Sequence, residues 1–385
     1  MPTDTAGDTA GAVTKKLAVA GPSALLIARL RGGLIRDCIS RNVRVLTMAP
    51  AMRAEEAPAL ISMGADVEAF NSRVEGFSLW PERAAIRLLA AQFKTSQPDA
   101  VLAFGSVAPF VVAAAKRAGV KRIVLLISEL PDRAQSLKSA KLRRALKASG
   151  VTIVHNLDDE RLIIESKLVS PDRLVRVAGA GADLVGMDGL AMPDWGLDVK
   201  PGDGSKSSNP LVFLACARLD RVKGVVDYLE AAAAVTAEGH AARFILAGPE
   251  GSGSNAVQMG VISRYSTSVE YAGDARNLSA AINEAHVFVC PSHLEGMPHA
   301  LLQAMAAGRP IIATDIAGAR ETIDEMVNGT LVPPRNPAAL ADAFRRLLKH
   351  RALLPAMARA SRAKAARGFA MADVNARILE ALKLP

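Results

Sequence analysis

The sequence predicts an α/β protein with two Rossmann-like, doubly wound parallel-sheet domains that face a cleft. Apolar, strand-like runs alternate with helical patterns from Lys16 onward, and the alternation starts again at Leu211. Between the two halves lies a stretch rich in Gly, Ser, Pro and Lys, residues 194–210, which is typical of a linker or surface loop. Half of the 385 residues are apolar and only 4% are aromatic, a composition that suits helices packed on buried parallel sheets.

The first half contains repeated strand–helix units, which favour right-handed crossovers and a parallel sheet. Strands are expected at residues 17–20, 43–48, 66–70, 100–104, 123–127 and 152–155. Helices are expected at residues 24–40, 57–63 and 84–95, through Lys116 after the fourth strand, and at 136–149.

The second half repeats the pattern. Strands are expected at residues 211–215, 243–247, 269–272, 287–290 and 311–314. Helices are expected at residues 224–238, from Pro298, and at 369–384. The domain boundaries that follow are a disordered tail at 1–15, a first domain at 16–185, a linker at 186–210, a second domain at 211–360 and a C-terminal helical segment at 361–385.

Several classes of protein are disfavoured by composition. No apolar run reaches the roughly 18 residues that a membrane-spanning helix needs, and the polar N-terminus lacks the apolar core of an export signal. Cys38, Cys216 and Cys290 are far apart, which favours a reducing cytoplasm without disulfides or a zinc cluster. The histidines, including His293, show no metal-site spacing, so we expect neither a metal nor a cofactor.

Positive charge is concentrated in the first half. Residues 1–180 carry 26 Lys and Arg against 17 Asp and Glu, whereas residues 181–385 carry 21 of each. Residues 136–149 have the pattern of a basic amphipathic helix, with leucines beneath the charges. Such a helix can lie on an anionic membrane surface, although a solvated basic face is the simpler alternative. Nucleic acid is disfavoured because no aromatic residues are interleaved with the basic ones.

The most informative segment is residues 291–323. An apolar run breaks at Pro291, a short loop carries Glu295 and Gly296, and Pro298 opens a helix that contains Gln303. A strand followed by a glycine-bearing loop and a helix N-terminus is a natural anion site, because free backbone N–H groups and the helix dipole point at the same place. A carboxylate and an amide beside that anion can bind hydroxyl groups. Phosphate together with hydroxyls indicates a sugar nucleotide.

This segment resembles the signature of the family 4 glycosyltransferases, which are retaining enzymes of the GT-B fold. Their pattern has two glutamates separated by seven residues, and here the positions hold Glu295 and Gln303. The resemblance implies that Glu295 faces the donor sugar and that Gln303 meets the nucleotide ribose. A glutamine keeps a hydrogen bond to a hydroxyl but loses the charge-assisted bond of a carboxylate.

A second motif, ARLDRVKG at residues 217–224, follows a strand and precedes a helix. The resemblance implies that Arg218 and Lys223 bind the donor diphosphate, whose negative charge needs cations in a water-poor cleft. Two surface cations at a helix start are the alternative. The backbone at Gly296 and Met297 is expected to help hold the diphosphate.

Further donor contacts rest on weaker signals. Gly248 ends a strand in the turn LAGPEG, where the backbone can approach a nucleotide, although a plain turn is an equal alternative. Arg276 and Asn277 lie where the family's backbone holds the base. The stretch AGAGADLVGM at residues 178–187 resembles the family's interdomain segment.

In the first half the chain is similar to a subgroup that elongates lipid-linked sugars in bacterial polysaccharide assembly. The residues expected to bind the acceptor are Gly21, Ser23, Arg31, Arg73 and Asn156. The segment LLISELPDRA at residues 125–134 departs from the subgroup's usual Gly-Leu-Gly turn. The resemblance also implies an acceptor-binding first domain, a nucleotide-sugar-binding second domain and a terminal helix that crosses back to the first.

The resemblance therefore implies a metal-independent, retaining glycosyltransferase for exopolysaccharide, O-antigen or related glycan assembly. It would use a UDP-sugar donor and a lipid-linked sugar acceptor, at the inner face of the cell membrane. Two alternatives stay open. One is a non-catalytic scaffold with a weakened donor site, and the other is a nucleotide-sugar epimerase, which needs no acceptor.

Overall fold

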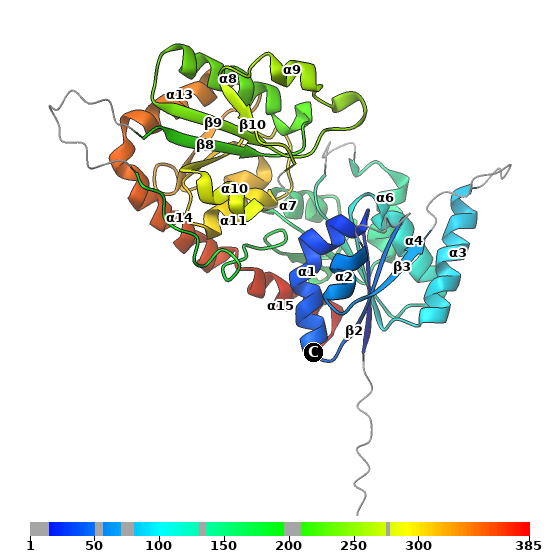
Figure 1. The fold of residues 1–385 in the computed structure, drawn as a ribbon. Coiled ribbons are helices and arrows are strands. Elements are labelled where there is room, and N and C mark those ends of the chain that lie inside the picture. Colours follow the sequence, from blue (N-terminus) through cyan, green and yellow to red (C-terminus); the bar gives the residue numbers. More distant parts are fainter. Residues whose placement is uncertain (1–14, 51–56, 71–80, 131–135, 196–208, 275–277) are drawn as a thin grey trace, which may run out of the picture. The chain divides into compact units, whose positions relative to one another are not determined.

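A computed structural model of the chain describes residues 15–50, 57–70, 81–130, 136–195, 209–274 and 278–385 (Figure 1). The chain divides into two compact units. The first contains the described residues up to Leu126, together with Ser139–Thr152 and Ile378–Pro385. The second contains the described residues of Ile127–Lys138 and of Ile153–Arg377.

The first sheet has the strand order β3-β2-β1-β4-β5-β6-β7 in the described part of the chain. Its strands are β1 (Lys16–Ala20), β2 (Arg44–Pro50), β3 (Asp66–Phe70), β4 (Ala100–Phe104), β5 (Arg122–Ile127), β6 (Val151–Val154) and β7 (Leu174–Arg176). Strand β1 pairs in parallel with both β2 and β4, so the order reverses its direction between β1 and β4. This is the doubly wound order that the sequence predicts.

The helices of the first half lie beside this sheet. They are α1 (Ala24–Ser40), α2 (Ala57–Ser62), α3 (Pro81–Ser96), α4 (Ala108–Ala118), α6 (Ala140–Ala148) and α7 (Leu157–Glu165). Helix α1 has the predicted bounds because the Ser23 hydroxyl accepts the N–H of Leu26 at 3.2 Å and caps it. Helix α6 begins later than predicted, since the Ser139 hydroxyl caps it by accepting the N–H of Leu142.

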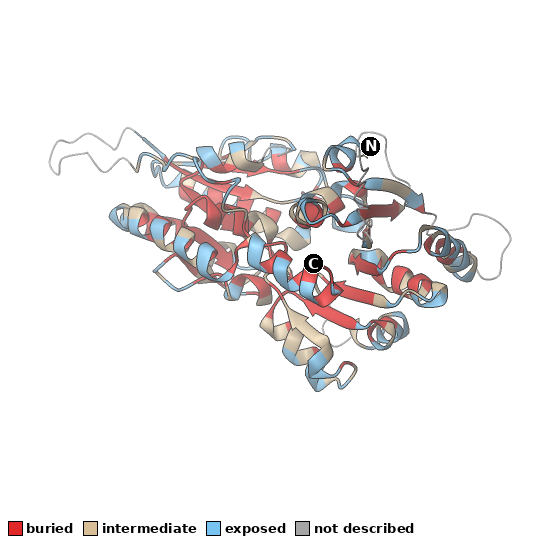
Figure 2. Cartoon of the chain, turned by 90° about the horizontal axis from the view of Figure 1, so that it is seen from below, coloured by how far each residue is buried: buried red, intermediate tan, exposed pale blue. Residues whose placement is uncertain are grey.

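The second sheet has the order β10-β9-β8-β11-β12-β13 in the described residues, with its reversal between β8 and β11. Its strands are β8 (Leu211–Cys216), β9 (Ala242–Ala247), β10 (Val269–Tyr271), β11 (Val287–Cys290), β12 (Ile311–Thr314) and β13 (Gly329–Val332). Burial is nearly continuous along β8, β9, β11 and β12, as expected for parallel strands covered on both faces (Figure 2).

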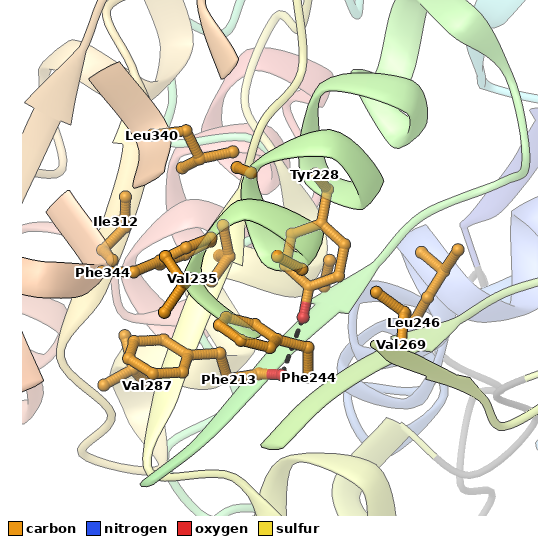
Figure 3. Close-up of a cluster of buried hydrophobic side chains, with 14 of the residues drawn as sticks. Phe213, Tyr228, Val235, Phe244, Leu246, Val269, Val287, Ile312, Leu340 and Phe344 are labelled. Atoms are coloured by element: carbon orange, nitrogen blue, oxygen red, sulfur yellow. Dashed lines mark hydrogen bonds between the residues drawn. The ribbon is translucent and has the colours of Figure 1, made fainter. Parts of the chain in front are cut away.

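Two apolar clusters cover the two faces of the second sheet. One joins alternate strand residues such as Phe213 and Phe244 to helices α8 (Val225–Ala237) and α13 (Pro337–Lys349). In this cluster Phe344 packs against both strand phenylalanines, and the Tyr228 hydroxyl donates to the Phe213 carbonyl at 2.8 Å (Figure 3). The other cluster joins strand residues that point to the opposite face to α10 (Leu278–Glu284) and α11 (His299–Ala306).

The remaining helices complete the second half of the chain. They are α9 (Met259–Ser263), α10 (Leu278–Glu284), α11 (His299–Ala306), α12 (Ala317–Arg320), α14 (Leu354–Gly368) and α15 (Met371–Leu382). Short 3₁₀ helices occur at Gly105–Val107, Pro171–Arg173, Arg221–Lys223, Gly253–Asn255 and Arg351–Leu353. Most of the expected linker, residues 196–208, lies outside the described residues. Across the described chain, no helix combines the length and the apolarity that crossing a bilayer requires.

Candidate active site

The loop after β8 carries two of the three predicted catalytic residues, Arg218 and Lys223. It closes at Gly224, whose backbone has φ 67° and leads directly into α8. A Cβ at Gly224 would lie 1.9 Å from the Pro291 carbonyl oxygen, so a side chain there would push the two loops apart. Glycine thus lets the loop after β8 pack directly on the loop after β11.

The loop after β11 carries the third predicted catalytic residue, Glu295. Because β8 and β11 are parallel neighbours, both loops leave the same edge of the sheet, at its topological switch point. The Lys223 ammonium donates to Glu295 Oε1 at 2.6 Å, and the Ser292 hydroxyl donates to the same oxygen at 3.3 Å. Both charged side chains are about one-fifth exposed, 18% for Lys223 and 20% for Glu295.

Arg218 is held by Asp220, a residue that we did not single out from the sequence. The Arg218 Nε donates to Asp220 Oδ2, while the Arg218 side chain remains 54% exposed. Asp220 itself is buried, and its Oδ1 has no hydrogen-bond partner among the described residues. The bond to Asp220 holds the Arg218 guanidinium at Nε and leaves its two terminal nitrogens able to bind a phosphate.

A pocket of about 90 Å³ brings the three predicted catalytic residues together. Its polar lining includes Arg218, Lys223, Ser292, Glu295 and His299. Lysine has three N–H donors, so the Lys223 ammonium can keep its bond to Glu295 and still bind phosphate oxygens. The arrangement suits an anionic ligand that also carries hydroxyl groups.

Glu129, at the carboxyl end of β5, belongs to the same electrostatic cluster. Burial raises the pKa of Glu129, the attraction of Lys223 opposes that rise, and repulsion from Glu295 adds to it. Burial alone would lower the pKa of Lys223, but its pairing with Glu295 and the nearby Glu129 carboxylate outweigh burial and raise it. Lys223 therefore stays charged between two carboxylates. The sequence offers one weak signal for Glu129, which lies two residues after the strand predicted at 123–127.

A second pocket, of about 220 Å³, adjoins Glu129 and Glu295. Its polar lining consists of Glu129, Asp158, Asp159, His293, Glu295, Asp315 and Arg320. His293, which lacks metal-site spacing in the sequence, bonds through Nε2 to Asp227 at 2.7 Å. Glu295 lines both pockets, which places it between the cationic pocket and this more acidic one.

Gly296 packs closely against backbone from two other segments. A Cβ there would lie 1.6 Å from the Ser128 carbonyl oxygen, and a Cβ at Gly318 would lie 2.1 Å from the Gly296 carbonyl oxygen. The Asn156 amide nitrogen donates to the Gly296 carbonyl at 2.9 Å, while its Oδ1 caps α7 by accepting the Asp159 N–H at 2.8 Å. Asn156, predicted to bind the acceptor, thus supports the loop after β11 that carries Glu295 and Gly296.

Gln303 and Met297 contact the stretch of residues 178–187. Gln303 is 3% exposed, and its Nε2 donates to the Gly181 carbonyl at 3.1 Å while its Oε1 accepts the Asp183 N–H at 3.1 Å. A Cβ at Gly179 would lie 2.8 Å from Met297 Cγ. The Gln303 side chain, which was predicted to bind the donor, is therefore hydrogen-bonded to the backbone of Gly181 and Asp183.

Of the other predicted donor residues, only Gly248 lies in the described part of the chain. Gly248 has φ 144°, and a Cβ there would lie 1.9 Å from the Ala217 carbonyl oxygen, so the turn packs on the residue before Arg218. Arg276 and Asn277 lie outside the described residues.

Three predicted acceptor residues belong to the first unit and have structural roles there. Ser23 caps α1. Gly21 leaves room for the Phe104 ring, which would lie 2.6 Å from a Cβ at Gly21, and the Arg31 guanidinium lies 5.6 Å from the centre of the same ring. Burial lowers the pKa of Arg31 to about 10. Arg73 lies outside the described residues.

Both the fold and part of the sequence are similar to known glycosyltransferases. The structure superimposes on Anabaena Alr3699/HepE, solved in complex with UDP and glucose, with a TM-score of 0.74 and 18% identity, covering 96% of this chain and 99% of that one. This likeness confirms the predicted GT-B type of fold with two Rossmann-like domains. Residues 210–350 match the model of the family described as Glycosyl transferases group 1. The predicted resemblance to glycosyltransferases is thereby confirmed, while family 4 stays a prediction.

Named glycosyltransferases are similar in sequence to this chain over part of their length. The chain is 28% identical over 156 residues to the alpha-D-kanosaminyltransferase of Streptomyces kanamyceticus, covering 40% of this chain and 38% of the relative. It is 26% identical over 225 residues to the amylovoran biosynthesis glycosyltransferase AmsK of Erwinia amylovora, covering 54% of each. The chain thus spans about half or less of the length of these relatives.

Proposed function

We propose that this protein is a retaining, metal-independent glycosyltransferase. It transfers a sugar from a nucleotide diphosphate sugar to a hydroxyl of a sugar acceptor in the assembly of a bacterial exopolysaccharide, O-antigen or related glycan. The observation that carries this proposal is the Lys223–Glu295 pair beside Arg218, at the switch point between β8 and β11. The family match over residues 210–350 covers all three residues.

In the proposed reaction the bond between the anomeric carbon and the diphosphate oxygen breaks, and its electrons stay on the diphosphate. The acceptor oxygen bonds to the anomeric carbon on the face from which the diphosphate leaves, and its proton passes to the departing diphosphate oxygen. Arg218 and Lys223 offset the growing negative charge, together with the backbone N–H groups at Gly296 and Met297, which is electrostatic stabilisation at a preformed site. Glu295 orients the sugar ring.

The proposal also assigns binding roles to the two domains. The second domain, residues 211–360, binds the donor, with Gly248, Arg276 and Asn277 near the base and Gln303 near the ribose. The domain at residues 16–185 binds the acceptor. Uridine is the favoured base. The HepE structures in complex with UDP support this choice, because HepE has the same fold.

The acceptor is proposed to be lipid-linked, and the protein to bind the anionic inner face of the cell membrane. One relative is named N,N'-diacetylbacillosaminyl-diphospho-undecaprenol alpha-1,3-N-acetylgalactosaminyltransferase, from Campylobacter jejuni, so a lipid-linked acceptor has a precedent among the relatives. The basic residues of α6 supply the charge for membrane contact.

The first test is calorimetric binding of UDP and GDP to the purified protein and to Lys223→Ala. Saturable binding of one nucleotide, lost in the variant, supports the donor site and identifies the base. Release of that nucleotide from a donor sugar only when an acceptor is present would then distinguish transfer from epimerisation. Binding of neither nucleotide would favour a non-catalytic scaffold.

A further inference from the structure

A groove of about 330 Å³ lies in the first unit among α3, α4 and α6, and the proposed glycosyl transfer makes no use of it. Helix α4 packs against both α3 and α6. The apolar residues that line the groove are Ile86, Pro109, Phe110, Val112, Ala113, Ala145 and Ala148. The charged residues that line it are Glu82, Arg83, Lys116, Lys141 and Arg144.

The apolar lining of the groove combines a stacked aromatic ring with three alanines. Phe110 stacks on Phe70 with ring centres 5.8 Å apart, which fixes one wall. Ala113 in α4 and Ala145 and Ala148 in α6 are methyl side chains at the places where the helices face the groove. Because small residues stand where leucines would fill the space, the groove stays open to an apolar chain.

The charge at the groove is positive. Lys141 pairs at 2.8 Å with Glu82, the one carboxylate among the described residues that line the groove. For Lys116 and Arg144, the described residues contain no ion-pair partner. An open apolar channel bordered by cations matches a ligand with an apolar chain and an anionic head.

We infer that this groove binds an anionic phospholipid of the membrane, with an acyl chain on the apolar lining and the phosphate at Lys116, Lys141 and Arg144. An acidic peptide would satisfy the cations but not the apolar lining. A purely electrostatic membrane contact would use all exposed cations of α6 equally, including Arg143 and Lys147, which do not line the groove. This groove would be the site of the membrane contact that we propose for α6, and lipid binding there does not depend on glycosyl transfer.

The first experiment compares two matched double variants by sedimentation with vesicles of equal parts phosphatidylglycerol and phosphatidylcholine. Lys141→Gln with Arg144→Gln removes two lining cations, and Arg143→Gln with Lys147→Gln removes two cations of the same helix outside the groove. At about a fivefold loss per cation near the surface, each pair loses roughly thirtyfold from charge alone. We expect a further loss of about tenfold in the lining pair. Equal losses would overturn the groove as a site.

The second experiment removes the bilayer. Monomeric dihexanoyl phosphatidylglycerol should bind the full chain saturably, and Ala113→Trp, which fills the groove and keeps every charge, should abolish this binding. Ala148→Leu serves if the tryptophan variant does not fold. Binding that survives both substitutions, or equal binding of poly-glutamate, would overturn the inference. Transfer to a water-soluble acceptor, measured in parallel, separates failure of the groove from failure of the proposed enzyme activity.

Discussion

The side-chain amide of Gln303 donates to the Gly181 carbonyl and, through its oxygen, accepts the N–H of Asp183, both at 3.1 Å. One buried side chain thus uses a donor and an acceptor on the same short stretch of backbone. That stretch is also held at Ala182, whose N–H donates to the Phe369 carbonyl at 2.7 Å. Residues 181–183 are therefore fixed from two directions.

We expect Gln303→Glu to destabilise the protein. A carboxylate can still accept the Asp183 N–H, but it offers no donor to the Gly181 carbonyl, so a buried acceptor loses its partner at a cost of about 1–3 kcal/mol. Thermal unfolding with and without UDP measures this. An unchanged midpoint together with tighter UDP binding would instead support the ribose contact that the family resemblance implies.

We expect Lys223→Ala to abolish transfer in a folded protein. It removes the cation between Glu295 and Glu129 and leaves both carboxylates facing the donor diphosphate. Losing one partner of a largely buried charge pair costs about 2–5 kcal/mol, which is a loss of at least thirtyfold in kcat/KM. Arg218→Ala should act in the same direction. The control is Lys349→Ala, an exposed lysine of α13. Full activity of either site variant would refute the phosphate assignment.

Substitutions at two glycines can distinguish the cost of backbone strain from the cost of disrupted close packing. Gly224 and Gly239 both have positive φ, 67° and 75°. A Cβ at Gly224 would meet the Pro291 carbonyl at 1.9 Å, whereas a Cβ at Gly239 meets nothing within 4 Å. Gly239→Ala should cost only the left-handed penalty of about 1–2 kcal/mol, and Gly224→Ala about 2–5 kcal/mol in total, with loss of donor binding. Chemical denaturation measures both, and equal costs would show that the loops can separate freely.

The raised pKa of Glu129 predicts a pH-dependent stability. Because the folded protein holds this proton more tightly than the unfolded chain, the contribution of Glu129 to stability is present at acidic pH and is lost as pH rises through its raised pKa. We expect Glu129→Gln to unfold at a higher temperature than the parent near neutral pH, with the gain vanishing below the ordinary carboxyl range. Glu230→Gln, on the exposed face of α8, is the control. A gain that is independent of pH would argue against burial of the charge.

Much of the fold could be predicted because its signals are local. Helix α1 has the predicted bounds since its cap, Ser23, adjoins its apolar pattern, and strands β3, β4, β11 and β12 also have the predicted bounds. Helix α6 was predicted too long because its charge pattern continues past the residue that caps it, Ser139. Strand β7 was missed, since three half-buried residues give no periodic pattern.

Local sequence patterns predict the two parallel sheets, the place of Arg218, Lys223 and Glu295 just after strands, and the glycines that the loops need. These depend on spacing and on the conformational limits of single residues. The partners of these residues depend instead on how the chain folds. Lys223 meets Glu295 across 72 residues, and Asn156 meets Gly296 across 140. Burial and pairing arise from contacts between distant segments, so Glu129 at the site and Gln303 on the backbone at Gly181 emerge only once the chain has folded.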